Sequence, residues 1–133
     1  PVAFLVLDID HFKAINDRHG HEIGDRVLIE VANIIEAQLR IQDLISRWGG
    51  EEFLAVLPDT SLNSAQASAE RVRKALLAHD WLATTDEPID LSISAGVSEF
   101  RRGDNLNSAI SRADRALYRS KEGGRNRVEL EAG

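Results

Sequence analysis

Cysteine and methionine are both absent from the 133 residues of this protein. The lack of cysteine excludes disulfides, thiolate metal sites and cysteine nucleophiles. No apolar run approaches the roughly 18 residues that a membrane-spanning helix needs. Hydrophobic residues still make up 43% of the chain and charged residues 29%, which excludes a disordered or fibrous protein. We therefore expect one domain over residues 1–133, with a core of its own.

Basic residues are fewer than acidic residues in this sequence. The 16 lysines and arginines face 22 acidic residues, for a net charge of −6. A nucleic acid polymer is disfavoured as a partner because its phosphates require a basic face. A small phosphate ligand stays compatible, since a local Mg²⁺ site can override the net charge. The chain starts at Pro1 instead of Met and shows no signal peptide, so we expect a piece of a longer protein.

The apolar pattern along the chain predicts both strands and helices. The strands are expected over residues 3–7, 44–48, 53–57, 91–97 and 127–130, and the helices over residues 22–40, 62–76 and 106–117. The two middle strands form a hairpin around two glycines, which makes part of the sheet antiparallel. An α+β sandwich, with helices packed on a mixed sheet, is the expected fold class.

Two acidic residues follow the first predicted strand. Alternation along an extended chain places Asp8 and Asp10 on one face and directs Ile9 into the core. Carboxylates at a strand end, beside an exposed main-chain carbonyl, are hard oxygen ligands that suit Mg²⁺. The alternative is that Asp10 only caps a helix that begins near Phe12.

The predicted hairpin turn combines two glycines with two acids, Gly49-Gly50-Glu51-Glu52. Glycines let a backbone approach a ligand closely, and the acids offer oxygens to a cation. If the hairpin lies beside the first strand, Glu51 and Asp8 face each other across neighbouring strand ends. Such carboxylate pairs hold a divalent ion or raise one pKa. A solvated acidic turn without a ligand is the alternative.

These blocks, together with later ones, resemble the GGDEF domain of bacterial diguanylate cyclases in its GGEEF form. The resemblance is carried by Asp8-Ile9-Asp10-His11-Phe12-Lys13, Asn16-Asp17, Gly20-His21, Gly24-Asp25, Arg47-Trp48-Gly49-Gly50-Glu51-Glu52-Phe53, Ser94-Ala95-Gly96-Val97, Ala113-Asp114-Arg115-Ala116-Leu117-Tyr118 and Lys121-Glu122-Gly123-Gly124-Arg125-Asn126. It implies a palm-like sandwich of the nucleotidyl cyclase type, related to the ferredoxin-like fold, with a mostly antiparallel central sheet. The family's leading helix, with its Asp-x-Leu-Thr signature, is not in the sequence.

The resemblance implies a Mg²⁺-dependent enzyme that condenses two GTP molecules into cyclic di-GMP and releases pyrophosphate. Mn²⁺ is the alternative metal. It further implies a homodimer in which each subunit presents one GTP, a cytoplasmic location, and an upstream regulatory domain outside this chain. The competing function is a catalytically silent module that binds GTP or cyclic di-GMP and signals to a partner.

The resemblance also implies a role for individual residues. Metal binding falls to Asp8, the carbonyl of Ile9, Glu51 and Glu52, and Glu51 is in addition the catalytic base. Substrate binding falls to Asn16 and Asp25 for guanine, His21 for the nucleotide, and Lys13, Lys121 and Arg125 for the triphosphate. Without the resemblance, these residues read as a turn amide, a helix-start charge and solvated surface cations.

A product-inhibition site is implied by Arg40 and Asp43, with Arg71 as an accessory contact. Two guanidinium groups beside one carboxylate could hold the phosphates and guanine edges of a cyclic dinucleotide. A salt bridge at a helix end, worth about 0–1 kcal/mol, is the alternative for Arg40 and Asp43.

Overall fold

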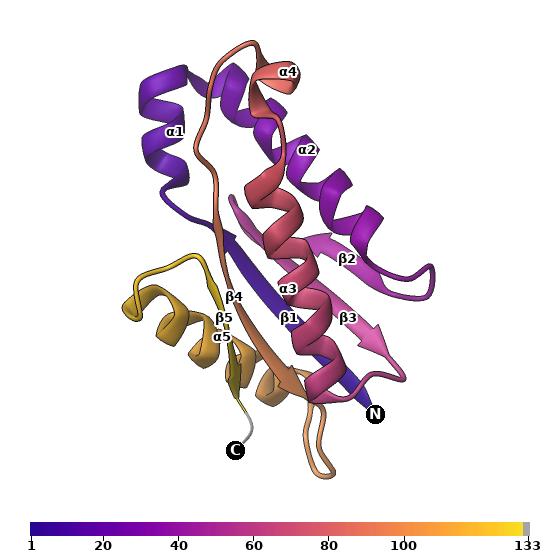
Figure 1. Cartoon of the computed structure of the whole chain (residues 1–133). Coiled ribbons are helices and arrows are strands. Elements are labelled where there is room, and N and C mark those ends of the chain that lie inside the picture. The colour runs from indigo at the N-terminus through magenta and orange to yellow at the C-terminus, as the bar shows by residue number, and fades with distance from the viewer. Residues whose placement is uncertain (132–133) are drawn as a thin grey trace.

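The computed structural model describes residues 1–131 and contains one five-stranded sheet with the strand order β2-β3-β1-β4-β5 (Figure 1). The strands are β1 (Val2–Ile9), β2 (Leu44–Arg47), β3 (Glu52–Pro58), β4 (Ile93–Glu99) and β5 (Arg127–Glu131). β1 pairs antiparallel with β3 and β4, β2 pairs antiparallel with β3, and only β4 and β5 are parallel. The predicted α+β fold with a mostly antiparallel sheet is confirmed.

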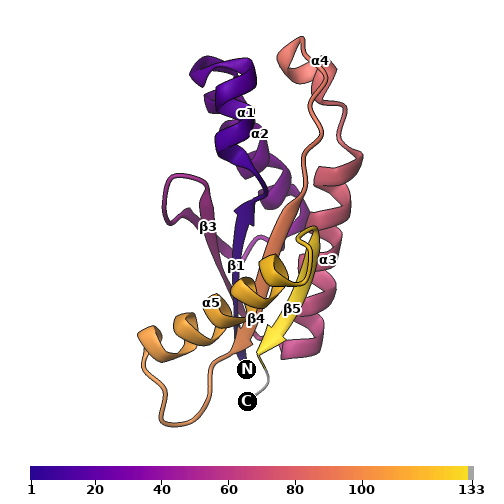
Figure 2. The same cartoon turned by 90° about the vertical axis from the view of Figure 1, so that its left-hand side faces the viewer.

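Helices cover both faces of this sheet. They are α1 (Phe12–His19), α2 (His21–Gln38), α3 (Leu62–Ala78), α4 (Trp81–Thr85) and α5 (Leu106–Glu122). α2 and α3 lie on one face and α5 on the other, while α1 and α4 stand beyond one end of the sheet (Figure 1, Figure 2). No helix within residues 1–131 has the length and apolar character required to cross a bilayer.

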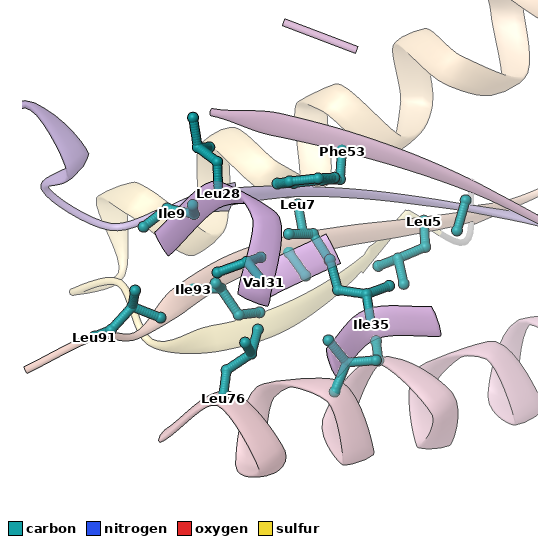
Figure 3. Packing of buried hydrophobic residues seen from close by; sticks show 14 of the residues in the cluster. Leu5, Leu7, Ile9, Leu28, Val31, Ile35, Phe53, Leu76, Leu91 and Ile93 are labelled. Atoms are coloured by element: carbon teal, nitrogen blue, oxygen red, sulfur yellow. The ribbon is translucent and has the colours of Figure 1, made fainter. Parts of the chain in front are cut away.

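The two faces of β1 belong to different parts of the core. Leu5, Leu7 and Ile9 pack against α2 and α3 in the main cluster (Figure 3). Phe4 and Val6 pack on the other face, against apolar side chains of α5. This alternation confirms that Ile9, which is 1% exposed, points into the main core. Asp8 consequently belongs to the face that α5 covers.

α5 approaches β4 so closely that only glycine fits at position 96. A Cβ atom on Gly96 would lie 2.0 Å from the carbonyl oxygen of Ala113 and 2.3 Å from the amide nitrogen of Leu117. The hydroxyls of Ser98 and Ser120 also donate to main-chain carbonyls across this interface, at 2.6 Å each. These contacts fix the position of the C-terminal end of α5 beside the end of β1.

Some elements differ from the sequence-based expectation. The predicted order omitted α1 and α4, because their eight and five residues are too few to show a clear helical period. β4 begins at Ile93 instead of residue 91, although Leu91 is buried in the main core. α2 ends at Gln38, two residues before its predicted end. The two additional short helices and the shifted ends leave the fold class unchanged.

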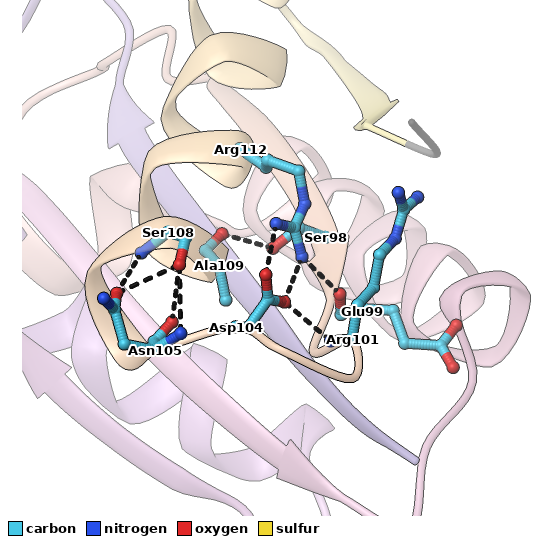
Figure 4. Close-up of polar contacts among 8 residues, drawn as sticks. All are labelled: Ser98, Glu99, Arg101, Asp104, Asn105, Ser108, Ala109 and Arg112. Atoms are coloured by element: carbon cyan, nitrogen blue, oxygen red, sulfur yellow. Dashed lines mark hydrogen bonds and ion pairs between the residues drawn. The ribbon is translucent and has the colours of Figure 1, made fainter.

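A buried arginine organises the loop between β4 and α5 (Figure 4). Both terminal nitrogens of Arg112 donate to the carboxylate of Asp104, at 2.9 and 2.6 Å, and one also donates to the carbonyl of Glu99 at 2.8 Å. The amide of Arg101 donates to the same carboxylate at 2.6 Å. Hydrogen bonds from Arg112 and Arg101 lower the pKa of Asp104 from its ordinary 3.8 to about 2.

This shift predicts a stability difference that depends on pH. Because the folded-state pKa of Asp104 is depressed, the ionised carboxylate stabilises the fold above about pH 4, and this contribution disappears as the pH falls towards 2. We expect Asp104→Asn to be less stable than the wild type at pH 5 and the gap to close at about pH 2. Urea unfolding across that range measures the gap, and a gap that stayed constant would contradict the assignment.

Candidate functional site

A pocket of about 180 Å³ lies where the end of β1, the β2–β3 turn and the C-terminal end of α5 meet. Its lining residues are Asp8, Ile9, Asp10, His11, Phe12, Lys13, Glu51, Lys121 and Arg125. Three of the four predicted metal-binding residues and all three predicted triphosphate contacts thus line one pocket. These residues come from segments more than a hundred positions apart in the sequence.

Asp8 carries a buried carboxylate with one oxygen engaged and one free. The Nζ atom of Lys121 lies 2.6 Å from Oδ2, and the residue is 7% exposed. The second oxygen, Oδ1, is buried and has no hydrogen-bond partner. A buried carboxylate oxygen without a donor is costly, unless a cation or another donor occupies its vicinity.

The β2–β3 turn brings two more acids to this end of the sheet. The amide of Ile9 donates to the carbonyl of Glu51 at 3.3 Å, and Glu52 is the register partner of Asp8. Burial, followed by repulsion from Asp8, raises the pKa of Glu51. Burial also raises the pKa of Glu52, with Asp114 of α5 as the next cause. Asp8 and Glu51 line the same pocket, as expected, but the residue that faces Asp8 across the strands is Glu52 and not Glu51.

The two glycines of this turn are not required by the backbone. Neither Gly49 nor Gly50 has a positive φ. A Cβ atom would meet nothing closer than 3.6 Å at Gly49 and nothing within 4 Å at Gly50. The absence of side chains here leaves open space beside Glu51, which is what a closely approaching ligand needs.

The residues present suit a divalent cation that is bound together with a phosphate ligand. Within residues 1–131, no three histidine or acidic side chains group into a complete metal centre. Mg²⁺ typically binds through one or two carboxylates and completes its shell with substrate phosphates and water. Asp8 with its unpartnered Oδ1, Glu51, Glu52 and the Ile9 carbonyl are the groups that could serve such an ion.

The predicted guanine contacts lie on α1 and α2, outside this pocket. Asn16 packs against α2, and a Cβ atom on Gly24 would lie only 1.7 Å from its Oδ1. This Oδ1 atom is buried and accepts no hydrogen bond. His21 and Asp25 lie in the first turns of α2 and are exposed. The arrangement leaves an unsatisfied acceptor at the position predicted to read a base.

The residues of the predicted inhibitory site make internal contacts. Arg40 pairs with Asp43 at 3.2 Å, and it donates to the carbonyl of Pro58 at 2.6 Å and to the hydroxyl of Thr60. Arg71, on α3, donates to Ser68 at 3.1 Å. The salt-bridge alternative is thus realised in the free protein, and binding of a product by these residues stays a prediction.

Sequence reasoning misjudged Asp10. The residue that precedes α1 as its N-cap is His11, in a left-handed conformation and without a side-chain cap bond, so the capping alternative for Asp10 is wrong. The Asp10 carboxylate instead accepts hydrogen bonds from Ser92, Ser94 and the amide of Asn126. The signal in the sequence was the pair Ser92 and Ser94 in the fourth predicted strand. Residues at alternate positions of a strand face the same side of the sheet, so both serines could donate to one carboxylate.

The molecule is thus an α+β domain with a sheet-end pocket lined by buried carboxylates and three cationic residues, a set of groups compatible with a polyanion and a divalent cation. The family model described as "Diguanylate cyclase, GGDEF domain" matches residues 1–127. The chain therefore belongs to the GGDEF domain family.

Individual relatives agree with this assignment. The chain is 45% identical over 130 residues to diguanylate cyclase A of Treponema denticola, covering 97% of this chain and 35% of that protein. It is 43% identical to the response regulator PleD of Caulobacter vibrioides, covering 96% of this chain and 29% of PleD. The chain thus spans about a third of the length of these curated relatives.

Solved structures of the family share the fold. The GGDEF domain of DgcB from Caulobacter crescentus, in complex with c-di-GMP, has a TM-score of 0.91 and 36% identity, covering 98% of this chain and 77% of that one. The active GGEEF domain of a diguanylate cyclase from Vibrio cholerae also has a TM-score of 0.91, with 34% identity, covering 99% and 83% of the two chains.

The contact of Lys121 with Asp8 predicts a measurable shift at the neighbouring acid. The Lys121 ammonium lowers the pKa of Glu51, against the larger effects of burial and of Asp8. We expect Lys121→Gln to raise the pKa of Glu51 further, because the variant keeps the acids and removes the cation. Carboxyl-carbon NMR titration of the metal-free protein measures this shift. An unchanged or lowered Glu51 pKa would contradict the electrostatic effect of Lys121 on Glu51, and Lys74→Gln on α3 is the matched control.

Proposed function

We propose that the protein is a diguanylate cyclase domain, which condenses two GTP molecules into cyclic di-GMP and releases pyrophosphate. The observation that carries this proposal is the convergence of Asp8, Glu51 and three cationic side chains on one pocket at the end of β1. Similarity to named diguanylate cyclases over nearly the whole chain supports it.

In this phosphoryl transfer, the main task of the protein is to position the charged groups of the nucleotides. Lys13, Lys121 and Arg125 bind the triphosphate, and Asp8, the Ile9 carbonyl, Glu51 and Glu52 hold the divalent cation. When bound, Mg²⁺, or Mn²⁺ in its place, neutralises phosphate charge and makes the attacking hydroxyl more acidic. Glu51 accepts the proton of the 3′-hydroxyl.

Base selection falls to the α1–α2 pair. The unpartnered Oδ1 of Asn16 can accept from an N–H group of guanine, and the Asp25 carboxylate is a second acceptor for the donor edge of the base. Adenine presents a different set of donors and acceptors at this edge, so these residues favour GTP over ATP. His21, at the start of α2, is a further nucleotide contact.

The proposal extends to assembly and regulation. Residues 1–133 form a single catalytic domain of a longer protein, located in the cytoplasm and joined to an upstream regulatory domain. Catalysis takes place in a homodimer, because each subunit presents one nucleotide to the other. Arg40, Asp43 and Arg71 bind cyclic di-GMP and inhibit the enzyme, once Arg40 has exchanged its internal contacts for the ligand.

Glu51→Gln tests the catalytic assignment. The variant retains the shape of the side chain but cannot accept the proton, so we expect cyclic di-GMP formation to fall at least about a hundredfold. Nucleotide products are measured by chromatography after incubation with GTP and Mg²⁺ over a range of protein concentrations. Wild-type rates in the variant would remove Glu51 from its role. Tight cyclic di-GMP binding by a wild-type protein without turnover would favour the silent receptor instead.

Gly24→Ala tests the base-reading assignment separately. The new Cβ atom would overlap Oδ1 of Asn16, so the amide must move, whereas a helical Gly→Ala change gains about 0.5–1 kcal/mol of helix stability. We therefore expect a folded protein whose preference for GTP over ATP falls about tenfold or more, as judged by competition binding. Unchanged discrimination would show that Asn16 does not read the base.

A further inference from the structure

The two aspartates at the end of β1, Asp8 within the strand and Asp10 just after it, are engaged in opposite ways. Asp8 has one buried oxygen without a partner, whereas both oxygens of Asp10 are occupied. Oδ1 of Asp10 accepts from the hydroxyl of Ser94 at 2.6 Å, and Oδ2 accepts from the hydroxyl of Ser92 at 2.7 Å. Asp10 is 6% exposed, and no ion pair within residues 1–131 involves it. Its hydrogen-bonding capacity is directed at the protein and not at the pocket.

The third donor to Asp10 comes from a strained turn. The amide of Asn126 donates to Oδ2 at 3.0 Å, in the segment that joins α5 to β5. Gly124, Arg125 and Asn126 have φ values of 115°, 66° and 47°, a left-handed run that non-glycine residues avoid. Such a conformation persists only where surrounding contacts hold it in place.

Three hydrogen bonds hold this turn in place. Asp10 holds the Asn126 amide, the amide of Arg125 donates to the carbonyl of Ser120 at 2.9 Å, and Arg73 of α3 donates to the Asn126 side chain at 3.0 Å. The Asn126 amide belongs to the peptide unit that immediately follows Arg125. Fixing that unit fixes the main chain of Arg125, a residue that lines the pocket.

We propose that Asp10 is a positioning residue, which sets Arg125 against the phosphate groups of the nucleotide by holding the Asn126 amide. This inference rests on the proposed nucleotide-binding function, and it assigns the second aspartate a task distinct from that of Asp8. A charged acceptor suits the task, because hydrogen bonds to a carboxylate are stronger than those to a neutral amide.

A double-mutant cycle separates positioning from a general structural role. The probe is 3′-deoxyguanosine triphosphate with Mg²⁺, which lacks the attacking hydroxyl and cannot condense, and its binding is measured by calorimetry. We expect Arg125→Ala and Asp10→Asn each to weaken binding by about tenfold or less, as for the loss of one charge-assisted contact. The double variant should bind no more weakly than Arg125→Ala alone, because Asp10 acts through Arg125.

The phosphate-free nucleoside provides a second readout. Binding of 3′-deoxyguanosine should be the same in the wild type and Asp10→Asn, since this ligand does not reach Arg125. In turnover assays, Asp10→Asn should raise KM for GTP more than it lowers kcat. Multiplicative losses in the cycle, or an equal loss of nucleoside binding, would overturn the proposal in favour of a purely structural role.

Two control variants test specificity. Ser94→Ala removes a donor to Oδ1 and leaves the Oδ2 contact with Asn126 intact, so triphosphate binding should be retained even if the unfolding temperature falls. Asp104→Asn disrupts a comparable carboxylate clasp at the opposite end of β4 and should not alter triphosphate binding. A loss of binding in either control equal to that in Asp10→Asn would reject the proposal.

The failure of this inference differs from a failure of the proposed function. A wild-type protein that does not bind 3′-deoxyguanosine triphosphate would refute the proposed function, and the positioning role with it. A wild-type protein that binds the probe, together with an Asp10→Asn variant that binds equally well, would refute only the positioning role.

Discussion

Negative charge concentrated at the end of β1 is the constraint on which the rest of this structure depends. Asp8, Glu51 and Glu52 are brought together by the antiparallel pairing of β1 with β3, and burial raises the pKa values of both glutamates. Such a cluster opposes folding unless cations or hydrogen-bond donors compensate it. The lysine at the end of α5 supplies one compensating charge, and the unpartnered Oδ1 of Asp8 shows that compensation is incomplete. The geometry thus favours an additional cation.

The compensating charge depends on packing far from the pocket. Lys121 reaches Asp8 because α5 packs closely against β4 over Gly96, and the hydroxyl of Ser120 donates to the carbonyl of Ala95 in the same interface. The same helix leads directly into the turn that carries Arg125. One rigid element therefore delivers two cationic side chains to one pocket, and small errors in its placement would move both.

Much of the fold was predictable from the sequence because long periodic segments determine it. The helical repeat of α2, the apolar run of β1 and the alternation in β4 reflect burial, which acts on many residues at once. The α4 helix was missed because its five residues contain less than two turns. The site was predictable only through the resemblance. Spacing alone left Asn16 and Lys13 indistinguishable from ordinary surface residues, and the fold shows that Lys13 lines the pocket whereas Asn16 lies outside it.

What the sequence could not reveal is how the two similar aspartates divide their work. Asp8 and Asp10 are adjacent on the same face, and their chemistry is identical. The difference arises from partners more than eighty residues away: a lysine that neutralises one oxygen of Asp8, and two serines with an amide that saturate Asp10. The carboxylate of Asp8 has a buried oxygen available for a cation, whereas both oxygens of Asp10 already hold two serine hydroxyls and a main-chain amide. Function at this strand end is therefore decided by which donors the tertiary fold supplies to each carboxylate.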